Sequence, residues 1–193
     1  MKKIVLIIVL SISCLSAMAQ YKIFDFGGLE YRADCHYNKN DFITINIRMQ
    51  SLDAYDVSIM IGTKKEYVCF INMLNLLKDK MIEWDSICVK NNISTINKNI
   101  PYKYGKKEIP SILFNKYYNS SPLYMGYTRN NNISKTVLFT SEVSHLLNKY
   151  IKCTGGLIAF NSPEQIDEFI NAFQMAPMTK YIDDQQNKMN LLK

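Results

Sequence analysis

Tyrosines and cations are interleaved between Pro101 and Arg129, and this segment has the residue types best suited to contact a ligand. Exposed aromatic rings can stack on the faces of sugar rings, while neighbouring lysines attract anionic groups. We therefore predict a surface here that binds a protein or glycan partner. The candidate binding residues are Tyr102, Tyr104, Lys106, Lys107, Tyr117, Tyr124 and Tyr127. The alternative is that these tyrosines alternate into the core of a sheet.

The charge of the chain does not favour a nucleic-acid partner. Its 193 residues carry a formal net charge of +6. Lys2 and Lys3 lie in the first 19 residues, which we expect to be cleaved off. Without them 21 basic residues face 17 acidic ones, a net charge of +4. Only three of the basic residues are arginines, the side chain whose planar fork best matches phosphate and guanine. We expect no nucleic-acid partner.

Four cysteines follow the N-terminal segment: Cys35, Cys69, Cys88 and Cys153. Their spacing is too wide for a zinc-binding motif. Cys69 and Cys88 fall on one predicted helix, which separates them by nearly 30 Å at about 1.5 Å per residue. A disulfide requires Cα atoms within roughly 7 Å. Any disulfide must therefore link different elements, and Cys35 with Cys153 is the candidate pair. Buried thiols are the alternative.

Residues that could support catalysis are present but have no diagnostic arrangement. The two histidines are His36 and His145, and neither lies in a known Cys–His motif. Carboxylates are scattered, and the chain has no nucleophile elbow, phosphate-binding loop or metal motif. We predict a non-enzymatic protein with no catalytic residues, metal or cofactor. The alternative is a secreted hydrolase with a site assembled across the sheet.

The first 19 residues have the pattern of a cleavable Sec-type signal peptide. Lys2 and Lys3 precede the apolar run from Ile4 to Leu10, and Ala17-Met18-Ala19 matches a signal-peptidase site. The apolar run is shorter than the roughly 20 residues of a membrane-spanning helix. Cys14 raises the alternative of a lipoprotein, but the leucine usual three residues earlier is replaced by Ser11. We expect export to the periplasm or the cell exterior, with no transmembrane segment after cleavage.

The elements that must position these residues indicate one α+β domain over residues 20–176. Its mainly antiparallel sheet would draw on apolar segments near 21–26, 29–37, 42–48, 57–61, 123–128, 135–140 and 157–160. An amphipathic helix is predicted over 64–90, opened by a Thr63–Glu66 capping box. A second helix is predicted over 163–175, opened by Ser162 and closed before Pro177. Residues 177–193 are expected to form a polar, flexible tail, and residues 141–150 fit either a helix or a strand.

Overall fold

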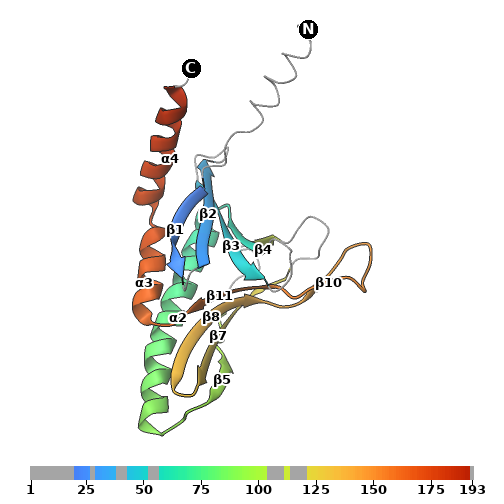
Figure 1. Ribbon diagram of the computed structural model, residues 1–193, viewed down its shortest axis with the longest axis vertical. Coiled ribbons are helices and arrows are strands. Elements are labelled where there is room, and N and C mark those ends of the chain that lie inside the picture. Colours follow the sequence, from blue (N-terminus) through green and yellow to red (C-terminus); the bar gives the residue numbers. More distant parts are fainter. Residues whose placement is uncertain are drawn as a thin grey trace.

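A computed structural model describes residues 20–26, 29–37, 43–51, 57–103, 111–113 and 121–191 (Figure 1). The predicted signal peptide, residues 1–19, lies outside the described residues.

The strands before the long helix are β1 (Gln20–Phe26), β2 (Leu29–Tyr37), β3 (Ile43–Ser51) and β4 (Val57–Ile61). The helix α2 (Lys64–Lys90) is followed by β5 (Ile96–Asn99), β6 (Ser111–Leu113), β7 (Leu123–Asn130), β8 (Ile133–Thr140), β9 (Val143–Ser144), β10 (Lys152–Cys153) and β11 (Gly156–Phe160). The helices α3 (Pro163–Ala172) and α4 (Met175–Asn190) end the described chain. The predicted α+β class is confirmed.

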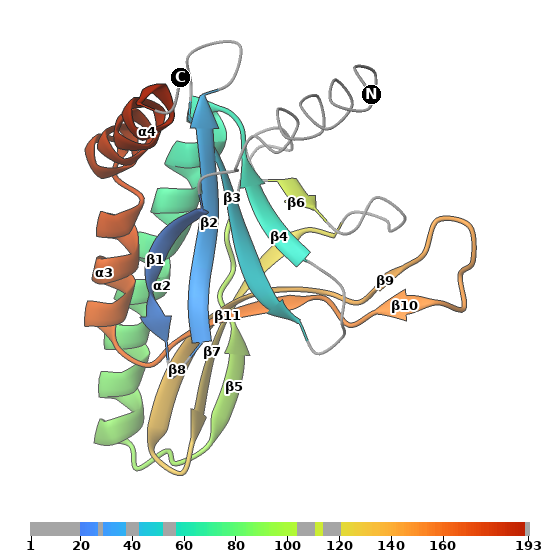
Figure 2. The same cartoon turned by 45° about the horizontal axis from the view of Figure 1, so that its top comes forward.

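Nine of the described strands form one antiparallel sheet in the order β1-β2-β3-β11-β8-β7-β5, with β4 on β3 and β6 on β4. The two halves of this sheet meet at a narrow seam, where Gly156 and Leu157 of β11 pair with Ser51 and Gln50 of β3. Figure 2 shows α2 and α3 side by side on one face of the sheet, which we call the inner face. The outer face is the opposite one.

The long helix α2 matches the predicted bounds. Thr63 caps it by accepting a hydrogen bond from the Glu66 backbone N–H at 3.2 Å, and the Glu66 carboxylate accepts one from the Gly62 N–H at 2.8 Å. The apolar face of this amphipathic helix is buried along most of its length, because it packs on β7, β8 and α3. The buried residues of α2 are Cys69, Phe70, Met73, Leu74, Leu77, Met81 and Cys88. This packing makes α2 a core helix of the domain.

Helix α3 closes the other side of the core through aromatic rings. Phe169 lies 5.2 Å from Phe160 of β11 and 6.3 Å from Phe70 of α2, measured between ring centroids. Phe173 follows at the end of α3, 5.9 Å from Phe70 in an edge-to-face arrangement. Each of these rings is fully buried, so the three elements are held by one aromatic cluster.

The C-terminal segment differs from the prediction of a flexible tail from residue 177. Residues Met175–Asn190 form helix α4, and Pro177 lies in its first turn instead of ending α3. Proline is tolerated there because a first-turn N–H has no helical partner. Met178 and Ile182, one helical turn apart, are 0% and 5% exposed, because α4 packs against β2 and β3.

The ambiguous segment 141–150 contributes to a β-hairpin. Val143–Ser144 pairs with Lys152–Cys153, so the segment is a strand followed by a loop and contains no helix. None of the helices in the described ranges is long and apolar enough to cross a membrane.

Candidate functional site

The predicted binding residues fall into different environments. Tyr102, Tyr124 and Tyr127 belong to the described residues, whereas four others lie outside them. Those four are Tyr104, Lys106, Lys107 and Tyr117. The three described tyrosines do not share one surface.

Tyr127 belongs to the core, which corrects its assignment to a binding surface. Its side chain is 1% exposed, and its ring meets Trp84 of α2 edge-to-face at 5.7 Å. Strand alternation explains this position, since Leu123 and Met125 on the same face of β7 are buried as well. Burial raises the pKa of the Tyr127 hydroxyl above the ordinary tyrosine value.

Tyr124 points to the outer face of β7 and is 41% exposed. It pairs in register with Phe139 of β8, and the two rings stack with centroids 5.5 Å apart. Side chains alternate between the two faces of a strand, and the buried residues of β7 that face α2 lie on the face opposite to Tyr124. Tyr124 is therefore separated by the sheet from any ligand that would contact α2.

Tyr102 is the predicted binding residue that the structure places beside several lysines. It is half-buried, and its hydroxyl lies 3.9 Å from the thiol of Cys69, which lies within the second turn of α2. A depression of about 570 Å³ opens between this tyrosine and the start of the helix. The residues lining it are Lys64, Lys65, Val68, Cys69, Asn72, Tyr102 and Lys103.

The charge of this depression, which we call the Tyr102 depression, has one sign. Lys64, Lys65 and Lys103 are exposed and line it, and no carboxylate is among its described lining residues. Glu66, the nearest acidic residue in sequence, is held by the Gly62 N–H in the helix cap. The depression thus combines three ammonium groups, one aromatic ring and the apolar side chain of Val68.

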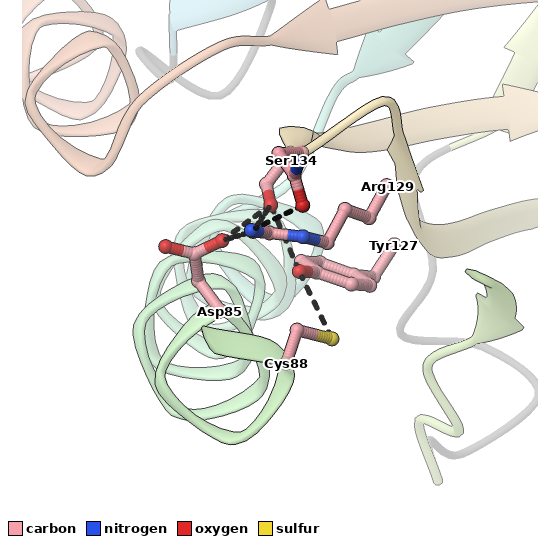
Figure 3. A network of polar contacts seen from close by, with 6 residues as sticks. Asp85, Cys88, Tyr127, Arg129 and Ser134 are labelled. Carbon is pink, nitrogen blue, oxygen red and sulfur yellow. Dashed lines mark hydrogen bonds and ion pairs between the residues drawn. The ribbon is translucent and has the colours of Figure 1, made fainter. Parts of the chain in front are cut away.

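A second polar cluster joins α2 to the β7–β8 hairpin, and no motif in the sequence marks it. In Figure 3, Arg129 of β7 points between Asp85 of α2 and Ser134 of β8. The Arg129 guanidinium donates to the Asp85 carboxylate, and to the Ser134 hydroxyl at 2.8 Å. Ser134 also donates to Asp85 and lies 2.9 Å from the Tyr127 hydroxyl, which in turn donates to the Cys88 thiol at 3.8 Å.

This cluster has the geometry of a structural cross-link. Arg129 is 6% exposed, so its charge has lost most of its hydration and depends on Asp85 and Ser134. The adjoining depression of about 560 Å³ includes Asp85 and Ser134 in its lining. Within the described ranges, neither depression places a cysteine beside a histidine or two carboxylates together. The hydrolase alternative gains no support from these two sites.

The structure contradicts the predicted disulfide between Cys35 and Cys153. Cys35, Cys69, Cys88 and Cys153 are all buried thiols, and no disulfide joins any two of them. Cys35 faces the core from β2, opposite Ile45, whereas Cys153 lies at the base of the β9–β10 hairpin. Groups of three or more metal-ligating side chains do not occur among the residues that the structure describes.

Comparisons with protein-family models, curated proteins and solved structures found no match for this chain.

Proposed function

We propose that this chain is an exported, non-enzymatic protein that binds the anionic groups of a protein or glycan partner in the Tyr102 depression. The observation that supports this most directly is the gathering of Lys64, Lys65 and Lys103 around Tyr102, with no carboxylate among the described residues that line the same surface. Lysine ammonium groups attract carboxylates and sulfates, and an aromatic ring beside them provides a face for a sugar or an apolar side chain.

Export is the part of this proposal that rests on the N-terminal pattern. If signal peptidase cleaves after Ala19, the protein recovered from the producing cell's envelope or medium begins at Gln20. N-terminal sequencing of that protein tests the point directly. An uncleaved chain starting at Met1, or a chain starting at a lipidated Cys14, would contradict it.

Binding is tested with two anionic probes, a polyuronate oligosaccharide and an oligoglutamate peptide, and with neutral dextran as the reference. The variant reverses the three lysines of the depression: Lys64→Glu, Lys65→Glu and Lys103→Glu. A control variant reverses three exposed lysines elsewhere: Lys90→Glu, Lys180→Glu and Lys188→Glu. Both variants have the same net charge, so a difference between them isolates the site.

The expected result is calorimetric binding of at least one anionic probe, weakened far more by the site variant than by the control. Each exposed ion pair contributes up to about 1 kcal/mol, which corresponds to roughly fivefold in affinity per lysine. Equal weakening by both variants would mean that only net charge matters. Failure of both anionic probes to bind would refute the proposed ligand chemistry.

A further inference from the structure

The β9–β10 hairpin projects from the body of the protein (Figure 2). Large apolar side chains are exposed at its tip. Leu147 is 87% exposed and Tyr150 is 84% exposed, the values of side chains that touch almost nothing. Leu146 and Ile151 beside them are 56% and 42% exposed. Single exposed apolar residues are common on proteins, but four within six positions form a patch that needs a partner.

Hydrogen bonds within the hairpin hold its tip in shape. The His145 N–H donates to the Ile151 carbonyl at 2.8 Å, and the Ile151 N–H donates to the Asn148 carbonyl at 3.0 Å. The Asn148 side chain accepts from the Tyr150 N–H at 3.1 Å. The tip loop is thereby ordered before it binds anything, which lowers the entropic cost of binding.

The base of the hairpin is anchored in the domain. Val143 and Cys153 pair across it and are 7% and 0% exposed. Gly155 has φ +88° and leaves no room for a Cβ beside the Thr140 carbonyl, so the chain turns sharply into β11. Because the base is buried and the tip is not, the apolar side chains of the tip contribute nothing to the core.

The charged residues between the two strands' outer ends, Val143 and Cys153, have one sign. The sequence from Val143 to Cys153 contains Lys149 and Lys152 and no acidic residue. Glu142 lies below the tip, where it pairs with Lys152 at 2.6 Å. The Lys149 ammonium lies 5.4 Å from the centroid of the Tyr150 ring, so the remaining cation of the hairpin is next to an aromatic side chain that is 84% exposed.

From this arrangement we propose that the hairpin tip inserts into the interface of a bilayer containing anionic lipid. A convex apolar tip needs a partner that closes around it, and a lipid interface does so without a preformed pocket. Tyrosine and lysine are both suited to the headgroup level, where the ring is half-buried and the ammonium reaches lipid phosphates. This surface is distinct from the Tyr102 depression and does not depend on the function proposed for it.

The test is co-sedimentation of the protein with vesicles of phosphatidylcholine alone or mixed with phosphatidylglycerol. The variant Leu146→Ser/Leu147→Ser removes apolar surface from the tip. The control Val89→Ser/Ile133→Ser removes comparable surface from two residues that are 60% and 63% exposed elsewhere. Lys149→Gln tests the contribution of charge.

We expect binding to the mixed vesicles, reduced roughly tenfold or more by the tip variant and unchanged by the control. Lys149→Gln should weaken binding about fivefold, and added salt should weaken the wild-type protein. A tryptophan introduced as Leu147→Trp should shift its emission to the blue with mixed vesicles. Circular dichroism confirms that each variant is folded.

Two outcomes would overturn the proposal. One is the absence of binding to either kind of vesicle by the folded wild-type protein. The other is equal loss of binding in the tip variant and the control. If vesicles do not bind but the tip variant abolishes self-association in sedimentation velocity, the tip contacts a second copy of the chain instead of lipid.

Discussion

Replacing Asp85 by asparagine removes the carboxylate that faces the buried guanidinium of Arg129 and changes the side-chain volume very little. Arg129 is 6% exposed, whereas the Asp85 side chain is 44% exposed. Breaking a fully buried ion pair costs about 3–5 kcal/mol, and breaking an exposed one costs about 0–1 kcal/mol. Because Ser134 still accepts from Arg129 and water can reach Asp85, we expect a loss of about 2 kcal/mol in the free energy of unfolding.

Urea unfolding followed by circular dichroism measures this loss, and thermal unfolding should show a Tm about 4–8 °C lower. Asp167→Asn is the matched control, since Asp167 pairs with Lys78 at 2.7 Å but the two side chains are 51% and 25% exposed. It should cost less than about 1 kcal/mol.

Arg129→Met gives the decisive comparison. It removes the buried charge itself, and water can hydrate the Asp85 carboxylate that remains. The free energy of unfolding should therefore fall by about 1 kcal/mol, less than for Asp85→Asn. If Arg129→Met is the more destabilising substitution, or if Asp85→Asn costs no more than Asp167→Asn, the buried charge of Arg129 does not depend on Asp85.

The remaining predictions concern packing, pH and thiols. Gly156→Ala should lower the free energy of unfolding by about 1–3 kcal/mol, because the new Cβ would lie 2.7 Å from the Cβ of Met49. Gly62→Ala is the control, since its Cβ would meet no atom closer than 3.8 Å. Equal Tm values for the two variants would contradict this prediction. Burial raises the pKa of Tyr67 and of Tyr127. The stability this provides is complete below the unfolded pKa of about 10 and is lost as pH rises through the folded value. Tyr67→Phe should therefore flatten the alkaline decline in unfolding free energy, and an unchanged decline would refute its role. A thiol reagent should label the four buried cysteines only after unfolding, with or without prior reduction; labelling that requires reduction would reveal a disulfide.

Helix α2 was predictable because its signals are local. The Thr63–Glu66 spacing marks its start, and apolar residues recurring every three or four positions, such as Phe70, Leu74, Leu77 and Met81, mark its buried face. Both depend on residues within a few turns of one another, so one sequence contains all the information needed.

Features set by tertiary contacts were not predictable in this way. Pro177 fits either the end of one helix or the first turn of the next, and the packing of Met178 and Ile182 on β2 and β3 decides for the latter. β5, Ile96–Asn99, is polar, and its position at the edge of the described sheet explains why no alternating pattern marks it.

The candidate site was predictable only in part. The segment containing Tyr102 was identified, but Lys64 and Lys65 reach the same depression from a distant part of the sequence. Composition also cannot tell which tyrosines of a strand face the core, and the structure places Tyr124 and Tyr127 on opposite faces of β7.

The seam between β3 and β11 has a consequence for the order in which the protein forms during synthesis. β3 emerges early, and its first residues can pair at once with β2 and β4. Its last residues, Gln50 and Ser51, must wait for Leu157 and Gly156, roughly a hundred residues downstream. Until then the end of β3 is an unpaired strand edge, and such an edge can pair with another chain and cause aggregation. β11, the last strand of the sheet to be synthesised, thus covers the open edge of β3, one of the first.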